Sequence, residues 1–182
     1  MKIVVVPHGP KLAIDRTKDY LAMVAADPPM TMEGKLKMLG LVPTLKDLGP
    51  YDAVYCSLMD RACGTMCTIV KQLGIKRVMC LDELGQYGNL DGDTVIAYPG
   101  HEGDNVLTWQ KQGLAFLDFI SLYQSLKKAL VFTHRPVLAG LVASASCITD
   151  TEGIQKILDA KELVGRGFRV FSCTNSGLTL EI

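Results

Sequence analysis

The sequence lacks the features that mark secreted, membrane-spanning and nucleic-acid-binding proteins. Its 19 basic and 19 acidic residues cancel, so the charge balance gives no reason to expect a nucleic-acid or membrane partner. The apolar run near the N-terminus, Ile3 to Val6, is too short for a signal-peptide core, and no uninterrupted apolar segment approaches bilayer length. We therefore expect a cytoplasmic protein.

Patterns for metal ions and disulfides are also scarce. The sequence contains no Cys-x-x-Cys and only three histidines. Cys63 and Cys67 would share one face of a helix, but no further ligands cluster near them. The cysteines lie among apolar neighbours, which favours reduced, buried thiols: Cys56, Cys63, Cys67, Cys80, Cys147 and Cys173. Neither a metal ion nor another cofactor is expected.

What the sequence does contain is an alternation of strand and helix patterns. At 182 residues, 48% of them apolar, the chain fits one α/β domain over residues 1–182. Apolar runs predict strands that are covered on both faces: Lys2–Val6, Asp52–Cys56, Lys76–Cys80, Ala129–Thr133 and Phe168–Ser172. Helical patterns lie between them, over residues 33–48 with an interruption marked by Pro43, 60–73, 105–127, from Pro136 onward, and 151–163. This order predicts a mostly parallel sheet with helices on both faces.

Two regions depart from the alternation. Asn175, Ser176 and Gly177 predict a tight turn, after which residues 178–182 return as an antiparallel edge strand. Residues 82–104 are rich in glycine and acidic side chains. A loop of that length in a compact domain is usually functional.

Chemically active residues follow four of the predicted strands. His8, Arg61 and His134 each stand shortly after a strand, and Asp82 and Glu83 follow another. In open α/β sheets, ligands bind beyond the carboxyl ends of the strands, so these side chains should converge on one edge. His101 has no strand end beside it, and a surface loop is the favoured interpretation there.

Together these residues fit phosphoryl transfer. A neutral imidazole such as His8 can attack phosphorus if cations and N–H donors offset the charge of the phosphoryl oxygens. Arg61, near a helix N-terminus, would bind those oxygens as a bidentate fork. His134, if protonated, would be a second donor. A carboxylic acid from Asp82 or Glu83 could protonate the leaving oxygen.

Segments along nearly the whole chain resemble the histidine phosphatase superfamily, whose fold is phosphoglycerate mutase-like. KIVVVPHGP is similar to the family's first strand and Arg-His-Gly signature, and YDAVYCSLMDRACGTMCTIVKQLG to its Val-Tyr-Ser-Ser-Pro-x-x-Arg-Ala-x-x-Thr-Ala segment. VFTHRPVLAGLVA resembles the second histidine motif, and weaker likenesses run through PPMTMEGKLKMLGL, LDELGQYGNLDG, YPGHEGD and CTNSGLTLEI. The resemblance implies a three-layer α/β/α sandwich and a metal-independent phosphatase acting on a phosphorylated small molecule or a phosphoprotein.

The resemblance also implies a role for each site residue. His8 would carry the phosphoryl group in a covalent intermediate, and Glu83 would donate the proton to the leaving group. Gly9, Arg61 and His134 would bind the phosphate.

The chain departs from the family pattern around both histidines. Pro7 stands where the signature has arginine, so one guanidinium fork is missing, and Arg135 replaces the glycine that usually follows the second histidine. Losing a charged donor costs about 2–4 kcal/mol of transition-state stabilisation. Arg135, Arg16 or Lys11 could restore the lost charge.

A third departure concerns the acid. Glu83 stands one residue further from Gly88 than the family spacing would place it, which leaves Leu84 in register. Either the loop carries an extra residue, or the proton donor is displaced, for example to Asp82.

Two functions therefore compete. The first is a metal-independent phosphatase with reduced activity, working through phosphohistidine at His8. The second is a catalytically weak or inactive family member that binds a phosphorylated ligand or a protein partner. A dinucleotide-binding domain is disfavoured, because no Gly-x-Gly-x-x-Gly follows the first strand.

Overall fold

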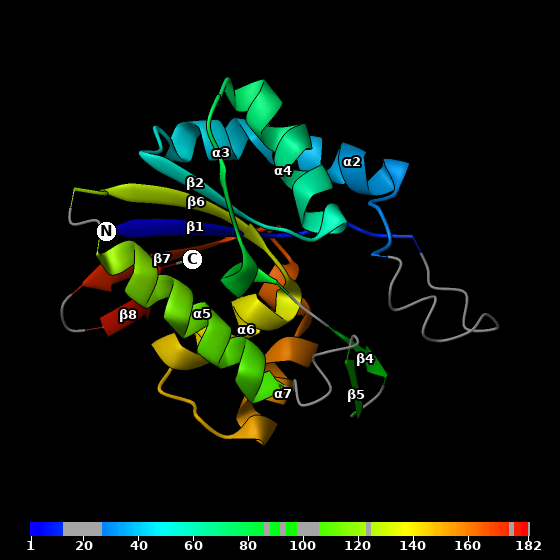
Figure 1. Ribbon diagram of the computed structural model, residues 1–182, viewed down its shortest axis with the longest axis vertical. Helices are drawn as coiled ribbons and strands as arrows, with labels where there is room; N and C mark the ends of the chain where they lie inside the picture. Colours follow the sequence, from blue (N-terminus) through cyan, green and yellow to red (C-terminus); the bar gives the residue numbers. More distant parts are fainter. Residues whose placement is uncertain are drawn as a thin grey trace.

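A six-stranded sheet forms the centre of the molecule (Figure 1). The computed structural model describes residues 1–12, 27–85, 88–91, 94–97, 106–122, 125–174 and 177–181. The strands lie in the order β3-β2-β6-β1-β7-β8: β1 (Lys2–Pro7), β2 (Ala53–Ser57), β3 (Met79–Leu81), β6 (Lys128–Thr133), β7 (Arg169–Thr174) and β8 (Gly177–Leu180). β1, β2, β3 and β6 run parallel, β7 is antiparallel to β1, and β8 is antiparallel to β7. The predicted mostly parallel sheet with an antiparallel C-terminal edge strand is confirmed.

Helices cover both faces of this sheet, as Figure 1 shows. One face carries α2 (Met32–Leu39), α3 (Val42–Leu48) and α4 (Asp60–Leu73). The other carries α5 (Val106–Ser121), α6 (Arg135–Ala145) and α7 (Thr151–Asp159). The predicted three-layer α/β/α arrangement is therefore confirmed. No helix in the described ranges is both long and apolar enough to cross a membrane.

Successive residues of β1 pack into two different cores. Val4 and Val6 belong to the core beneath α2, α3 and α4, whereas Ile3 and Val5 belong to the core beneath α5, α6 and α7. Side chains of a strand alternate between the two faces of a sheet, so a strand covered on both faces needs apolar residues at every position. This explains the continuous apolar run at the start of the sequence.

Two predicted helices are each divided in the structure. Residues 33–48 form α2 and α3, separated at Gly40 and Leu41. Pro43 is the second residue of α3, where its missing N–H leaves no helical hydrogen bond unmade. Residues 151–163 form α7 and then the 3-10 turn η2 (Lys161–Val164), with the extended residue Ala160 between them.

The remaining helices follow the sequence pattern. The helix predicted over 60–73 is confirmed at both ends, and α6 begins at Arg135, one residue before the proline that predicted its start. The long helix predicted over 105–127 is shorter, because α5 ends at Ser121.

The third predicted strand is displaced and is not covered on both faces. Residues 76–80 contribute only the start of β3, which pairs with β2 alone at the edge of the sheet. Met79 and Cys80 are exposed there. The expectation of buried thiols is likewise wrong for most cysteines: all six are free, but only Cys56 is fully buried, and Cys67, Cys80 and Cys147 are exposed.

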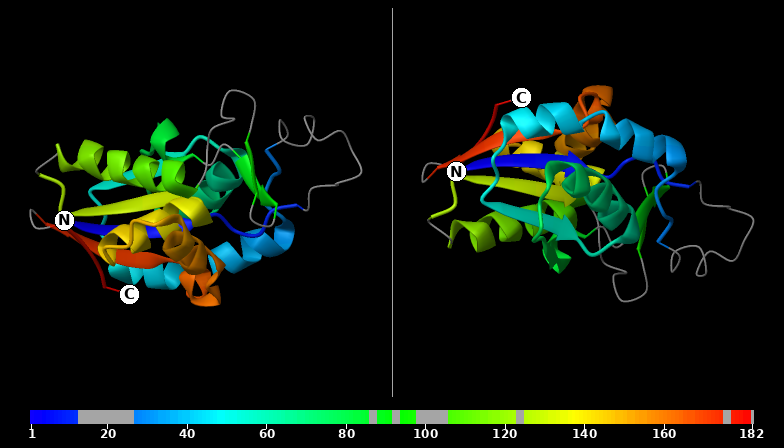
Figure 2. Two further views of the ribbon diagram at one scale, coloured as in Figure 1. Left: turned by 90° about the horizontal axis from the view of Figure 1, so that it is seen from below. Right: turned by 90° about the horizontal axis from the view of Figure 1, so that it is seen from above.

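The glycine-rich region 82–104 begins with the 3-10 turn η1 (Asp82–Leu84). A separate hairpin follows, formed by β4 (Gly88–Asp91) and β5 (Thr94–Ala97). The predicted edge strand is confirmed as β8, whereas the turn residues Asn175 and Ser176 lie outside the described residues. The carboxyl ends of β1 and β6 point to the same end of the molecule, away from the N-terminus (Figure 2).

Candidate active site

His8 is fixed by backbone hydrogen bonds at the end of β1. Its N–H donates to the Thr133 carbonyl (2.9 Å), which extends the parallel pairing of β1 with β6 by one residue. Its ring Nδ1 lies 2.8 Å from the Gly9 carbonyl oxygen. A carbonyl can only accept, so Nδ1 carries the proton and a neutral ring keeps its lone pair on Nε2.

The environment keeps the His8 ring neutral. Burial is the main cause that lowers its pKa to about 4; the Gly9 hydrogen bond opposes this, and the charges of Arg61 and Lys11 lower it further. At neutral pH the Nε2 lone pair is therefore available.

Gly9 allows the chain to pass close to neighbouring side chains. A Cβ at this position would lie 2.7 Å from Met30 Sδ and 2.9 Å from Met38 Cγ, so any larger residue would force these methionine side chains to shift. The Gly9 N–H donates to Thr65 Oγ1 (3.0 Å). Gly9 is a predicted phosphate-binding residue, and its amide is already engaged within the protein.

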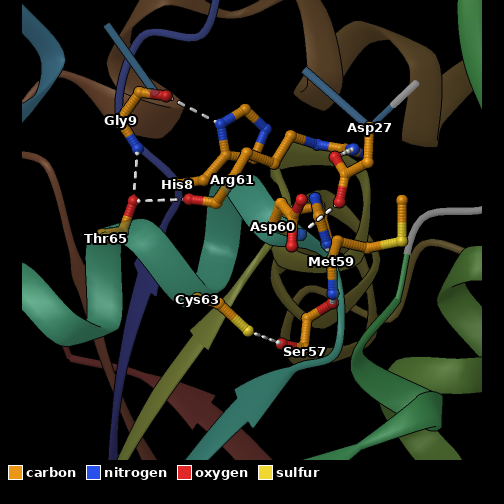
Figure 3. A network of polar contacts seen from close by, with 10 residues as sticks. His8, Gly9, Asp27, Ser57, Met59, Asp60, Arg61, Cys63 and Thr65 are labelled. Carbon is orange, nitrogen blue, oxygen red and sulfur yellow. Dashed lines mark hydrogen bonds and ion pairs between the residues drawn. The ribbon is translucent and has the colours of Figure 1, made fainter. Parts of the chain in front are cut away.

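Arg61 is buried at the start of α4 and lies beside the His8 ring (Figure 3). Its guanidinium pairs with the Asp27 carboxylate, whose other oxygen accepts the N–H of Asp60. Thr65, one helical turn further on, donates its hydroxyl to the Arg61 carbonyl (3.0 Å). Despite its ion pair, Arg61 contributes to lowering the pKa of His8 and of the second histidine, His134.

His134 follows β6 and lies next to His8. The two ring centroids are 5.2 Å apart, with the planes inclined at 63°. His134 Nε2 lies 2.9 Å from Ser57 Oγ, which also accepts the Met59 N–H (3.2 Å). The Ser57 proton is therefore available for Nε2, and we assign the remaining ring proton of His134 to Nδ1.

The surroundings of His134 decide which of its ring nitrogens can donate. The ring is fully buried, and burial, followed by the charges of Arg61, His8 and Lys11, lowers its pKa well below the usual 6.5. His134 is thus neutral at pH 7, so its donor is the Nδ1–H. Among the described residues this buried Nδ1 has no hydrogen-bond partner.

A cavity of about 250 Å³ opens beside His8 and contains further cations. Its lining is formed by Pro7, His8, Gly9, Pro10, Lys11, Lys37, Met38, Arg135, Val164 and Gly167. Burial, followed by the charge of Arg61, lowers the pKa of Lys11 to about 8. Arg135 is anchored by a bond from its Nη2 to the Ala160 carbonyl (3.2 Å).

The two acid candidates lie in η1 and are exposed. Leu84, the position in register with the family's acid, is fully buried in the core with Tyr55 and Phe116. Its carbonyl accepts the Thr133 hydroxyl (2.7 Å), which ties η1 to the residue before His134. A proton donor on this turn would therefore be Asp82 or Glu83, and the choice between them stays a prediction.

Two predictions fall outside the described residues. Arg16, suggested as a replacement cation, lies within 13–26, and His101 lies within 98–105. In the described part of the chain, no group of three or more His, Cys, Asp or Glu side chains is arranged to hold a metal ion.

Sequence reasoning missed three residues that hold the site together. Thr65 could have been found, since it lies one helical turn after Arg61 on the same face. Ser57 directly follows its strand core but gave no sign of its bond to His134. Asp27 is 34 residues from Arg61 in sequence, and no local pattern reports such a contact.

Comparison with known proteins identifies the fold through solved structures. No protein-family model matches the chain, and no curated protein matches it significantly. Solved structures do match: alpha-ribazole phosphatase from Shigella flexneri has a TM-score of 0.69 at 18% identity, covering 100% of this chain and 95% of that one. This chain has the histidine phosphatase fold.

Other structures with this fold align nearly as well. Phosphoserine phosphatase from Entamoeba histolytica has a TM-score of 0.67 at 16% identity, and the protein histidine phosphatase SixA has 0.63 at 18%, each covering 100% of this chain and 95% of the other. Within the histidine phosphatase fold, β1, β2 and β6 of this chain end at one edge, where His8, Ser57 and His134 lie together.

Proposed function

We propose that this protein hydrolyses phosphomonoesters through a phosphohistidine formed at His8. The observation that carries this proposal is the Nδ1–H bond from His8 to the Gly9 carbonyl in a ring whose pKa is lowered to about 4. Together these keep the ring neutral and leave the Nε2 lone pair for attack on phosphorus. The likeness to phosphatase structures supports the same general activity.

The reaction has two steps. Nε2 of His8 attacks phosphorus, and the P–N bond forms as the bond to the leaving-group oxygen breaks. That oxygen takes a proton from the acid, for which Glu83 is our first candidate and Asp82 our second. Water then attacks the phosphohistidine, the P–N bond breaks, and orthophosphate leaves as the acid recovers its proton from the water.

The phosphoryl oxygens would be held by three donors around the two rings. Arg61 supplies a buried charge, Lys11 a second one, and His134 its Nδ1–H, for which the described part of the chain offers no acceptor. Such donors stabilise charge that develops in the transition state. Lys11 compensates in part for the arginine that Pro7 replaces, so we expect reduced rather than absent activity.

The alternative is a family member that binds a phosphorylated ligand or protein partner without turnover. It is favoured by the pairing of Arg61 with Asp27, which offsets part of the positive charge, and by the proline at position 7. The neutral His8 with its oriented lone pair favours the enzyme. A cytoplasmic protein without a metal cofactor remains part of the proposal.

Trapping the covalent intermediate tests the proposal. The protein is incubated with p-nitrophenyl phosphate and excess chelator, and any acid-labile phosphoryl adduct is mapped by mass spectrometry. We expect an adduct on His8 and slow, chelator-insensitive release of phosphate, both lost in His8→Ala. Turnover that survives in His8→Ala, or that needs added metal, would overturn the mechanism. Tight phosphate binding with no adduct and no turnover would instead favour the alternative.

A further inference from the structure

The cavity beside His8 is lined by three cationic side chains. Its cations come from three separate segments: Lys11 follows β1, Lys37 lies in α2, and Arg135 begins α6. No acidic side chain is among its lining residues in the ranges that the structure describes. The site thus presents a cationic surface that extends beyond Arg61.

These cations differ in their effect on the two histidines. Lys11 acts with Arg61 on the pKa of both rings. Arg135 and Lys37 are not among the main charges that act on either ring, although Arg135 directly follows His134 in the chain. Arg61 and Lys11 are therefore suited to the phosphoryl group, and Arg135 and Lys37, which line the same cavity, are suited to another part of the substrate.

Arg135 is hydrogen-bonded to the segment around η2. Its Nη2 donates to the Ala160 carbonyl (3.2 Å), just before η2, and Val164 of η2 and Gly167 line the same cavity. Its Nε is buried and has no hydrogen-bond partner among the described residues. A buried donor of a charged group is costly to leave unpaired, and an anion at this position would satisfy it.

The volume of the cavity limits the size of the substrate. About 250 Å³ lies just below the usual range for ligand pockets. A compact molecule of a few carbon atoms fits this volume better than the surface of a folded phosphoprotein.

We infer that the substrate is a small phosphomonoester bearing a second anionic group, a carboxylate or a second phosphate, which Arg135 and Lys37 hold while the phosphoryl group lies at His8. This inference rests on the proposed phosphatase function. It assigns Arg135 to recognition of the substrate, not to replacement of the missing arginine.

Matched substrates test the inference on the full chain. Carboxyalkyl phosphates of two to four carbons are compared with alkyl phosphates of equal length, and alkane bisphosphates of the same lengths distinguish a carboxylate from a second phosphate. We expect a lower KM for the doubly anionic compounds. Arg135→Gln should raise that KM by about 10–100-fold with little change in kcat, and it should raise the KM of the alkyl phosphates by a much smaller factor. Lys37→Gln should act in the same direction, whereas Lys35→Gln, on the same helix but outside the cavity, should change nothing.

The outcomes separate this inference from the proposed function. Equal KM values for both classes, or an equal effect of Arg135→Gln on both, would overturn the second-anion site while His8-dependent turnover still stands. Preference for a phosphopeptide over every small compound would overturn it too. If no substrate is turned over, calorimetric titration of His8→Ala with the doubly anionic compounds decides: binding that depends on Arg135 supports the site, and binding that does not depend on it contradicts it.

Discussion

At the scale of single residues, Thr65 helps to hold His8, the proposed nucleophile, in place. Its hydroxyl accepts the Gly9 N–H and donates to the Arg61 carbonyl, and Gly9 in turn accepts the His8 ring proton. Thr65→Val would leave the buried Gly9 N–H without an acceptor. We expect the free energy of unfolding to fall by about 1–3 kcal/mol, together with the rate of phosphate release.

Thr68 provides the matched control for that substitution. It lies on the same helix, and its hydroxyl donates to the Gly64 carbonyl (2.8 Å). Thr65 makes the equivalent bond to the Arg61 carbonyl, also four residues earlier in the chain. Thr68→Val should change the free energy of unfolding by about 0.5 kcal/mol or less. Urea titrations and phosphate-release assays on both variants check this; equal losses in the two would show that the Gly9 contact has no special weight.

At the scale of elements, the contact between α2 and the loop after β1 shapes the site. A Cβ at Gly34 would lie 2.4 Å from the Pro10 carbonyl oxygen, whereas a Cβ at Gly64 in α4 would meet nothing closer than 3.8 Å. Gly34→Ala should therefore lower the free energy of unfolding by about 1–3 kcal/mol through overpacking and reduce activity by moving the loop. Gly64→Ala should raise it by about 0.5–1 kcal/mol, since alanine is the better helix former. Thermal unfolding of both variants measures the difference, and stabilisation by both would contradict the close packing.

At the scale of the whole molecule, two buried neutral histidines link stability to pH. The pKa of His8 and of His134 is lower in the folded protein than the usual 6.5. Below pH 6.5 these two histidines become protonated in the unfolded chain but stay neutral in the native state. The free energy of unfolding therefore decreases as pH falls. Urea titrations between about pH 7.5 and 5 should show this decrease, and His8→Asn should remove about half of the slope.

Carboxylates contribute to the pH dependence only at lower pH. The pKa of Asp52 is lowered by the backbone N–H groups of Lys128 and Lys127, and that of Glu181 by Ser172 and Lys2. The stability they contribute is present above their ordinary values near 4 and is lost as pH falls further. A slope between pH 7.5 and 5 that is unchanged in both His8→Asn and His134→Asn would contradict the assignment to histidines.

The sequence predicted those parts of the fold and site that depend on local patterns. His8, Arg61 and His134 could be placed because each follows a strand, and strand ends are readable from short apolar runs. The direction of β7 could not be predicted, because a strand covered on both faces has the same apolar pattern whether it runs parallel or antiparallel to its neighbour. The partnership of Arg61 with Asp27, and that of His134 with Ser57, depend on contacts across the fold. The third strand was predicted over residues 76–80, but β3 covers only Met79–Leu81. How much of this apolar run pairs with β2 depends on its position at the sheet edge, which residue types do not show.

The order of the strands has a consequence for how long each part of the site stays assembled. His8 and His134 end β1 and β6, adjacent strands with a neighbour on either side, whereas Asp82 and Glu83 follow β3, a three-residue strand at the sheet edge. Amide protons of interior strands exchange with solvent only in the rare events that open the whole domain, and those of short edges exchange through small local openings. His8 and His134 therefore keep their geometry for as long as the protein stays folded. Asp82 and Glu83, the proposed proton donors, are in contrast held by an element that opens and closes many times within that lifetime.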